Sequence, residues 1–212
     1  MTKVLIATRN RHKADEIQVL LGPEFDCQTL SGIEGTPIVI EDADSFHGNA
    51  LKKAMTIAGW IREIGSHRAD FVLADDSGLE VDALGGAPGV HSARFAALDG
   101  SGPGNAPDDE NNAKLLRLLQ HSPPERRAAR FRCVIVLAEV VEAGRRWTFE
   151  GSCEGRIGLK ASGSGGFGYD PLFLPAGYEI SFGALGEEVK NKISHRARAL
   201  AALKTGWQSG LK

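Results

Sequence analysis

The sequence has few cysteines and no long apolar run, and both absences limit the kind of protein it encodes. Its 3 cysteines, Cys27, Cys133 and Cys153, are widely spaced and form no Cys-x-x-Cys pair. This spacing disfavours a disulfide framework or a zinc site, and free thiols are typical of a reducing cytoplasm. No apolar segment approaches the roughly 18 residues of a membrane span, and Val4–Ala7 is too short for the core of a signal peptide. We therefore expect a cytoplasmic protein with no membrane partner.

An excess of charge of one sign is also lacking. The chain has 212 residues, with 25 Lys and Arg against 27 Asp and Glu, so its net charge is −2. Binding to long nucleic acid through bulk charge needs a basic excess and is not expected. A small anionic ligand needs only a local basic cluster. The hydrophobic share of 42% and the charged share of 25% are typical of a soluble globular protein and exclude disorder.

Short apolar runs alternate with amphipathic helical patterns along the chain. The predicted strands are Val4–Ala7, Ile38–Ile40, Phe71–Ala74, Phe131–Val141 and Trp147–Cys153. The predicted helices span about Arg11–Leu21, Ser45–Ile64 and His195–Gln208, with another after Asp108–Glu110. Strand–helix units around a central hairpin predict an α/β fold with a mixed sheet. We treat residues 1–212 as a single domain.

The turn between the first predicted strand and helix is a candidate phosphate site. It contains Thr8, Arg9, Asn10, Arg11, His12 and Lys13. Backbone N–H groups at a helix start, beside a hydroxyl, an amide and cations, suit a phosphate. Alternatively, Thr8 or Asn10 caps the helix and the basic side chains are solvated, and the turn alone does not decide. The sequence has no Walker A pattern, so a P-loop fold is not supported.

Two adjacent carboxylates, Asp75 and Asp76, come directly after the apolar run Phe71–Ala74. The carboxyl end of a strand is where open α/β sheets place ligands. Adjacent acids repel, and burying either one without a partner is costly. A divalent cation would remove that cost, and Mg²⁺ is typically held by one or two carboxylates together with substrate phosphates. The alternative is an Asx turn with solvated aspartates, but so apolar a strand before the pair favours the metal.

A lysine in the long predicted helix has an unusual position. Helical spacing places Lys53 on the flank of the buried stripe, beside Asn49 and Ile57, whereas Lys52 points to the far side. A lysine at the edge of a buried face either reaches into a cleft or extends its ammonium group to solvent. Both interpretations stay open at this point.

A glycine-rich loop matches a nucleotide-binding pattern in letters only. Gly163–Gly168 fits G-x-G-x-x-G, but Tyr169–Pro171 follows and blocks the helix that a dinucleotide site requires. The Rossmann interpretation therefore fails. The loop either presents Phe167 and Asp170 to a flat ligand or is an ordinary tight loop.

Charged residues near two predicted helix starts receive opposite interpretations. Asp108–Glu110 is interpreted as ordinary helix-start chemistry without a metal role, because carboxylates favour the positive end of the helix dipole. Lys190, His195 and Arg196 are cationic groups near a helix start, which is unfavourable without a partner. They indicate an anionic or acceptor-rich ligand, or else a solvated basic helix end.

These segments, in this order, carry a resemblance that covers nearly the whole chain. The matching residues are Ala7–Asn10 with Lys13; Phe46, Asn49, Ala50 and Lys53; Ala74–Leu79; Gly85–Gly89 with Ser92–Arg94; Gly165–Pro171; and Ser194–Arg196. Together they resemble the inosine triphosphate pyrophosphatase family, enzymes that remove non-canonical purine nucleotides. The resemblance implies Mg²⁺-dependent hydrolysis of a nucleoside triphosphate to the monophosphate and pyrophosphate by a cytoplasmic homodimer. It also implies an elongated mixed sheet flanked by helices, in two lobes with the nucleotide in a cleft between them.

The resemblance assigns roles by matching position. Asp76 would be the general base and a metal ligand, and Lys53 and Lys13 would assist catalysis. The implied substrate-binding residues are Thr8, Arg9, Asn10, Arg11, His12, Lys13, Ser77, Phe167, Gly168, Tyr169, Asp170, Lys190, His195 and Arg196. Within this set, Arg196 and His195 would donate to the 6-keto oxygen of the base, and Phe167 would stack on it.

The chain departs from the family pattern at two places. The family often has an acidic residue directly before the Asn-Ala pair, where this chain has Gly48, so Glu41 becomes the candidate second metal ligand. The loop 99–107 is longer than usual and receives no role. Two other functions stay open: a non-catalytic nucleotide-binding or sensing protein, and a pyrophosphatase for other modified nucleotides. Two acids and two lysines argue against a protein that only binds nucleotides, because binding alone needs no paired carboxylates: Asp75, Asp76, Lys13 and Lys53.

Overall fold

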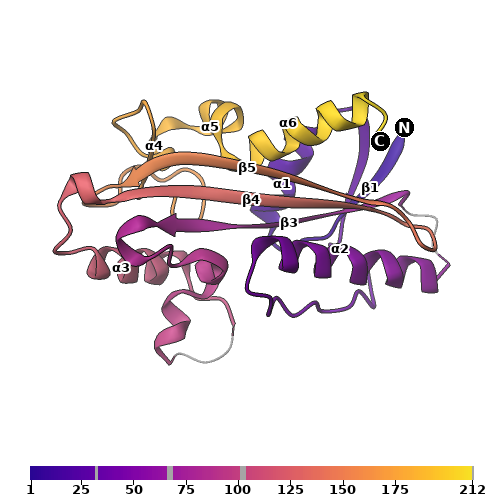
Figure 1. Ribbon diagram of the computed structural model, residues 1–212, viewed down its shortest axis with the longest axis horizontal. Helices are drawn as coiled ribbons and strands as arrows, with labels where there is room; N and C mark the ends of the chain where they lie inside the picture. Colours follow the sequence, from indigo (N-terminus) through magenta and orange to yellow (C-terminus); the bar gives the residue numbers. More distant parts are fainter. Residues whose placement is uncertain (32, 66–68, 101–103, 212) are drawn as a thin grey trace. The chain divides into compact units, whose positions relative to one another are not determined.

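The computed structural model describes residues 1–31, 33–65, 69–100 and 104–211. The chain forms two compact units (Figure 1). Unit 1 comprises Met1–Asp76, Cys133–Gly151 and Arg196–Lys212, and unit 2 comprises Ser77–Arg132 and Ser152–His195. None of the helices in the described ranges is long and apolar enough to cross a membrane.

A six-stranded sheet has the order β2-β1-β3-β4-β5-β6. The strands are β1 (Thr2–Ile6), β2 (Phe25–Thr29), β3 (Phe71–Val81), β4 (Ala128–Glu139), β5 (Arg146–Ile157) and β6 (Phe173–Pro175). β1 is parallel to both β2 and β3, whereas β5 and β6 are antiparallel. The predicted α/β fold with a mixed sheet flanked by helices is therefore confirmed.

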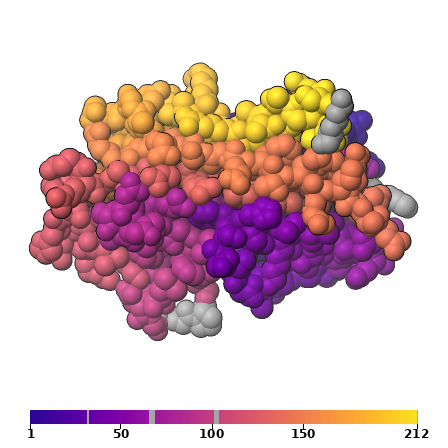
Figure 2. All heavy atoms as spheres, in the orientation of Figure 1, coloured from indigo at the N-terminus to yellow at the C-terminus, as the bar shows by residue number. Residues whose placement is uncertain are grey.

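In unit 1, helices cover both faces of the sheet. They are α1 (Arg11–Leu21), α2 (Phe46–Glu63) and α6 (His195–Gln208). Strand alternation directs Val4 and Ile6 to one face, where they share a core with Ile17 of α1 and Leu200 of α6. Figure 1 shows α2 on the opposite side of β3 from α6. In Figure 2 the atoms of α2, in purple, form part of the surface of unit 1. Each buried aliphatic side chain contributes about 1.5–3 kcal/mol to the stability of this core.

Unit 2 has an aromatic core. Its helices are α3 (Asp108–Leu118), α4 (Phe182–Leu185) and α5 (Glu187–Ile193), with short 3₁₀ segments at Asp82–Leu84, Gly89–Arg94, Ala96–Asp99 and Pro124–Arg126. The rings of Phe131 and Phe173 lie 4.7 Å apart, and those of Phe173 and Phe182 lie 5.4 Å apart. Leu115 of α3 packs into the same buried cluster.

One predicted strand is wrong, and another was missed. Ile38–Ile40 lies in a segment without regular structure, and Ile38 is 82% exposed. The strand beside β1 is instead Phe25–Thr29. Three consecutive β-branched residues favour an extended backbone, but an extended segment becomes a strand only where a partner strand pairs with it.

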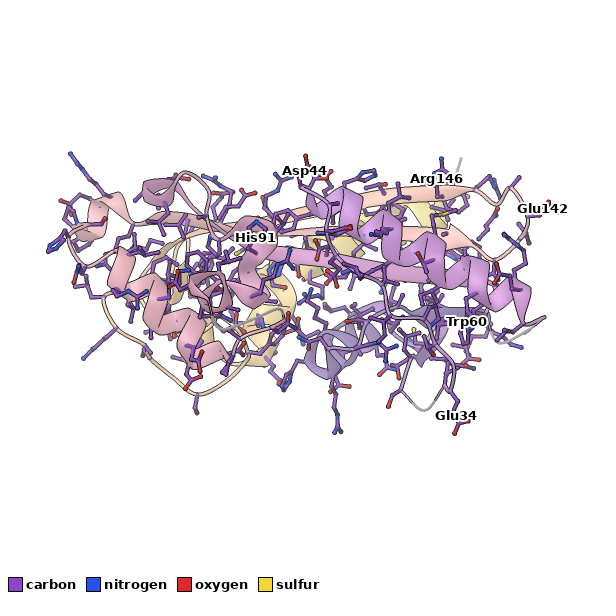
Figure 3. All side chains as sticks on the ribbon, turned by 90° about the horizontal axis from the view of Figure 1, so that it is seen from below. Glu34, Asp44, Trp60, His91, Glu142 and Arg146 are labelled. Atoms are coloured by element: carbon purple, nitrogen blue, oxygen red, sulfur yellow. The ribbon has the colours of Figure 1, made fainter. Side chains whose placement is uncertain are left out.

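The strand that carries the two adjacent aspartates is longer than predicted. The apolar pattern predicts a strand that ends before Asp75, but β3 continues to Val81. Asp75 and Asp76 therefore lie inside a strand rather than in a turn after it. The hairpin strands also extend beyond their predicted ends, since β4 begins at Ala128 and β5 ends at Ile157. Figure 3 shows Glu142 at the end of this hairpin.

Candidate active site

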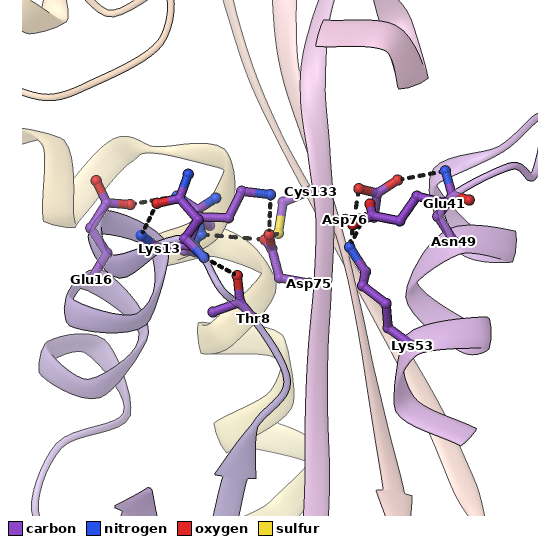
Figure 4. Close-up of polar contacts among 11 residues, drawn as sticks. Thr8, Lys13, Glu16, Glu41, Asn49, Lys53, Asp75, Asp76 and Cys133 are labelled. Atoms are coloured by element: carbon purple, nitrogen blue, oxygen red, sulfur yellow. Dashed lines mark hydrogen bonds and ion pairs between the residues drawn. The ribbon is translucent and has the colours of Figure 1, made fainter. Parts of the chain in front are cut away.

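Strand geometry sends Asp75 and Asp76 into different environments. Successive side chains of a strand point to opposite faces of the sheet. Figure 4 shows Asp75 on the side of β3 where Lys13 lies, and Asp76 on the side of Lys53. Both carboxylates are buried, with 1% of Asp75 and 6% of Asp76 exposed. The two aspartates therefore have separate partners and separate chemistry.

On one face, Asp75 is surrounded by hydrogen-bond donors. Lys13 Nζ lies 2.6 Å from its Oδ1, and Arg196 Nε and Cys133 Sγ lie 3.3 and 2.9 Å from its Oδ2. Burial alone would raise the pKa of Asp75, but the charges of Arg196 and Lys13 outweigh it and hold that pKa well below its usual value. Burial and the neighbouring carboxylate raise the pKa of Cys133, so its thiol stays protonated and donates. Asp75 is thus an anchor that is ionised at neutral pH.

Arg196 lies within this anchor. It is 1% exposed and forms ion pairs with Asp75 and with Glu16 of α1. Burial opposes its charge, but the two carboxylates raise its pKa above the ordinary value. A purine base would have to compete with these carboxylates for the guanidinium donors. The base-reading role of Arg196 therefore stays a prediction, while its contacts show that it holds Asp75.

On the other face, α2 and the segment before it surround Asp76. Asn49 and Lys53 are four residues apart on α2, which places them on the same face of the helix. Asn49 Nδ2 donates to Asp76 Oδ2 at 3.2 Å, and Lys53 Nζ lies 3.4 Å from Asp76 Oδ1. The same ammonium group lies 2.8 Å from Glu41 Oε2. Lys53 therefore joins two carboxylates, and these contacts decide between the two interpretations that its helical spacing left open.

The protonation of Asp76 differs from that of its neighbours. Burial raises its pKa, the charges of Lys53 and Lys13 lower it, and Glu41 raises it again, so that the pKa is about 6. Burial would also raise the pKa of Glu41, but Lys53 outweighs it and the pKa is lowered. An acid whose pKa lies near neutrality is suited to accepting a proton at physiological pH.

The Asp76–Glu41 pair has the chemistry of a magnesium site. The part of the chain that the structure describes contains no group of three or more His, Cys, Asp or Glu residues arranged around a metal. Mg²⁺, however, usually takes only one or two carboxylates, and water and substrate phosphates complete its shell. The raised pKa of Asp76 reflects in part the nearby Glu41 carboxylate, and a cation would relieve that repulsion. The two residues therefore fit such an ion.

The turn before α1 performs the capping that the sequence left as an alternative. Asn10 Oδ1 accepts from Lys13 N at 3.1 Å, which caps the helix. Thr8 Oγ1 accepts from Asn10 N at 3.2 Å. Arg9 donates to the carbonyl of Thr36 at 3.0 Å. The structure brings the basic side chain of Lys13, from this turn, to Asp75.

Two further residues of this turn are exposed. Arg11 lies 3.9 Å from Asp15 on the surface of α1, and His12 is exposed as well. An exposed pair of this kind adds little stability. Their predicted contacts with substrate stay predictions.

The predicted nucleoside residues other than Arg196 lie in unit 2, and we call Phe167–Asp170 the nucleoside loop. Asp170 Oδ2 accepts from Phe167 N at 2.9 Å and pairs with Lys190 Nζ at 2.6 Å. The Lys190 ammonium also lies 4.6 Å from the centre of the Phe167 ring. Gly166 has φ +73°, and a Cβ there would lie 2.1 Å from Asp170 Oδ2. The loop is therefore held by a buried ion pair that only glycine at position 166 permits.

The remaining predicted residues of unit 2 have structural partners of their own. Tyr169 donates its hydroxyl to the carbonyl of Ser92 at 2.9 Å, and burial raises its pKa. His195 stacks on Phe131, with ring centres 4.8 Å apart. Ser77 follows Asp76 in β3 and begins unit 2. The predicted site residues thus form two groups, one in each unit.

Comparison with known proteins gives the family. The Ham1 family model matches residues 4–206. The chain belongs to the Ham1 family. It is 48% identical over 200 residues to a dITP/XTP pyrophosphatase of Desulforamulus reducens, with 93% of this chain and 92% of that protein covered. It is 44% identical over 205 residues to a dITP/XTP pyrophosphatase of Shouchella clausii, with 96% of each covered.

A solved structure agrees with this assignment. The HAM1 protein from Coxiella burnetii has a TM-score of 0.81 and 34% identity, covering 99% of this chain and 100% of that one. The family resemblance that the motifs predict is therefore confirmed for this Ham1 protein over nearly its full length.

Sequence reasoning left several contacts of this Ham1 protein unassigned. Asn49 shares a helix flank with Lys53, so its spacing could have marked it as a partner of Asp76. Glu16 and Cys133 carried no such signal, because their contacts with Arg196 and Asp75 join residues far apart in the chain. Asp108 was interpreted only as a helix-start acid, but it also accepts from the backbone of Gly168.

Proposed function

We propose that this protein hydrolyses non-canonical purine nucleoside triphosphates (ITP, dITP and XTP) to the monophosphate and pyrophosphate. The observation that carries the proposal is Asp76, a buried carboxyl group with a pKa of about 6 that contacts Lys53 and lies beside Glu41. The names of the relatives, dITP/XTP pyrophosphatases aligned over most of their length, support the same substrates. The protein is thus a nucleoside-triphosphate pyrophosphatase.

In the proposed reaction, Asp76 accepts the proton of the attacking water. Asn49 and Lys53 hold its two oxygens, which orients the carboxylate for that transfer. Hydrolysis of a phosphoanhydride needs positioning and charge stabilisation rather than a covalent intermediate. The ammonium groups of Lys53 and Lys13 supply positive charge for the charge that develops on the phosphates.

Mg²⁺ is the metal we propose for this enzyme, held by Asp76 and Glu41. When bound, it would neutralise phosphate charge and polarise the phosphoryl oxygens. The positive charge of the bound ion would also allow Asp76 and Glu41 both to be ionised in the working enzyme. Lys53 is charged even without the metal, because the neighbouring Asp76 and Glu41 outweigh the effect of burial and raise its pKa.

The nucleoside is proposed to bind residues of unit 2. Phe167 offers an aromatic ring for stacking, and base–aromatic stacking contributes about 1–3 kcal/mol with little preference among bases. A 6-keto purine has an acceptor where adenine has an amino donor, so the donors of Arg196 and His195 would discriminate between them where they reach the base. Phosphate contacts are proposed for Lys13 and the start of α1.

We further propose that the enzyme is a cytoplasmic homodimer and that residues 1–212 act as one domain. These points follow the family resemblance, and dimers are the commonest homo-oligomers.

A panel of nucleotides tests the proposal directly. The purified protein is incubated with Mg²⁺ and, separately, with ITP, dITP, XTP, ATP, GTP and modified pyrimidine triphosphates, and pyrophosphate and phosphate are assayed. We expect pyrophosphate release from ITP, dITP and XTP, and less from ATP, whose base has a 6-amino donor in place of the 6-keto acceptor. Binding of these nucleotides without turnover would support a sensing protein instead. Faster turnover of the pyrimidines would identify a pyrophosphatase for other modified nucleotides.

A further inference from the structure

Helix α3 holds the backbone of the nucleoside loop from outside it. Asp108 Oδ2 accepts from Gly168 N at 2.6 Å, and Asn112 Nδ2 donates to Gly168 O at 2.9 Å. The two side chains are four residues apart, so they lie on the same face of α3. One helix face therefore binds both main-chain polar groups of a single loop residue.

These bonds restrain the most mobile type of residue in the loop. Gly168 has φ +62°, a left-handed conformation that favours glycine. The bond from Asp108 fixes the peptide plane before Gly168, and the bond from Asn112 fixes the plane after it. Because glycine has the largest backbone freedom to lose, fixing both planes in the free protein lowers the ordering cost of binding a ligand.

The surroundings of Gly168 leave room for such a ligand. Apart from its two chain neighbours, a Cβ built at this position would meet no heavy atom within 4 Å among the residues that the structure describes. Glycine is therefore required here by the backbone angle and not by crowding. Because Gly168 has no side chain, a ligand can approach its backbone closely.

The buried amide oxygen of Asn112 indicates that this side chain serves more than packing. Its Oδ1 is buried and has no hydrogen-bond partner within the described ranges. A buried polar atom left without a partner is unfavourable, and an aliphatic side chain of similar size would avoid that penalty. The donation from Nδ2 to the carbonyl of Gly168 is the contact that an aliphatic side chain could not make.

We propose that Asp108 and Asn112 are positioning residues for purine binding. By holding Gly168, they fix the backbone from which Phe167 is presented to the base. On the other side of Phe167, its N–H is held by Asp170. This inference rests on the proposed function, since it assumes that the nucleoside loop binds the purine. Asp108 is thus more than a favourable charge at the start of a helix.

Four variants of the full-length protein test this role. Asp108→Ala removes the acceptor, and Asp108→Asn keeps an acceptor oxygen. Asn112→Leu removes the donor together with the unpaired oxygen. Glu110→Ala is the matched control, because it removes an equal charge from the same first turn of α3. For each protein, kcat and KM for dITP are measured by pyrophosphate release, binding of the product dIMP by calorimetry, and Tm by thermal unfolding.

We expect Asp108→Ala and Asn112→Leu each to raise KM for dITP about three- to tenfold. The kcat should change by less than about twofold, because the lost interaction stabilises the bound substrate and the transition state equally. The Kd for dIMP should rise in parallel. Asp108→Asn should restore most of the affinity, and Glu110→Ala should match the wild type. Asn112→Leu should not lower Tm, so a merely structural role would not produce its rise in KM. The double variant Asp108→Ala with Asn112→Leu should raise KM by less than the product of the single effects, because both bonds act on Gly168.

A separate variant distinguishes failure of this inference from failure of the proposed function. If Phe167→Ala raises KM for dITP while Asp108→Ala and Asn112→Leu leave it unchanged, the positioning role is wrong and the proposed function stands. A wild-type protein that releases no pyrophosphate from dITP, or a Phe167→Ala variant with normal KM, would overturn the nucleoside loop and the positioning role together.

Discussion

Asp75 and Asp76 are identical side chains one residue apart, and their environments shift their pKa values in opposite directions. Asp75 has Lys13, Arg196 and Cys133 as donors, and its pKa is well below the usual value. Asp76 is buried close to Glu41, and its pKa is about 6. The same conservative substitution at the two positions should therefore have opposite effects on stability.

Asp76→Asn should inactivate the enzyme while stabilising the fold. We expect kcat to fall by about 10²-fold or more, because the base and a metal ligand are lost together. The folded-state pKa is raised, so the stability that Asp76 contributes is present below its unfolded pKa and is lost as the pH rises through about 6. In metal-free buffer at pH 8, chemical unfolding should show the variant about 1–3 kcal/mol more stable. Near-normal turnover would refute the assignment of Asp76.

Asp75→Asn should destabilise the protein at neutral pH. Breaking a buried ion pair from one side typically costs about 3–5 kcal/mol. Because the folded-state pKa of Asp75 is depressed, its contribution is present above the unfolded pKa and is lost as the pH falls through the folded value. Urea unfolding should show that the variant has a much lower free energy of unfolding than the wild type at pH 7, and that this difference shrinks below about pH 4. If the variant were as stable as the wild type at pH 7, the ion pairs of Asp75 with Lys13 and Arg196 would not contribute to stability.

At the scale of single elements, the direction of α2 decides which of two adjacent lysines lies beside Asp76. Lys53 is buried between Asp76 and Glu41, whereas Lys52 pairs with Asp42 at the surface. The helix begins after Ser45, whose hydroxyl accepts from Gly48 N at 3.1 Å. A Cβ at Gly48 would lie 2.7 Å from the Cβ of Ala43, so glycine lets the preceding segment, which carries Glu41, pack closely on the helix.

Lys53→Ala and Lys52→Ala form a matched pair. The first removes the charge shared by the two carboxylates, and we expect kcat for dITP to fall by about 10²-fold. The second removes an exposed ion pair, which typically contributes less than about 1 kcal/mol, so its activity and stability should stay close to wild type. Steady-state kinetics and thermal unfolding of both variants check this. Equal losses of kcat in the two variants would contradict the direction of α2.

At the scale of the whole molecule, the assembly state is the open prediction. We expect a symmetric homodimer, which has the same contact surface on both subunits. Light scattering at micromolar concentration should therefore give twice the chain mass of 22.6 kDa. A stable monomer that still turns over dITP would exclude the dimer as a requirement for activity.

The sequence by itself determined the alternation of strands and helices, because apolar periodicity is a local signal. It also placed Lys53 and Asn49 on one helix flank, excluded a Rossmann helix after Gly168, and carried the family motifs. It did not determine the strand beside β1, because the apolar pattern predicts a strand at Ile38–Ile40 and none at Phe25–Thr29. Strand pairing depends on partners distant in the chain, which no local pattern contains.

Only the tertiary structure decided which groups surround each carboxylate. The extension of β3 through Asp75 and Asp76 places them on opposite faces, whereas the sequence pattern placed both directly after the end of the strand. Arg196 reaches Asp75 across 121 positions, and Asp108 reaches Gly168 across 60. Charge and burial shift a pKa through distances in space, and folding sets those distances. The residue types of the site were therefore readable from the sequence, while the division into an ionised anchor at Asp75 and a titratable base at Asp76 was a consequence of packing.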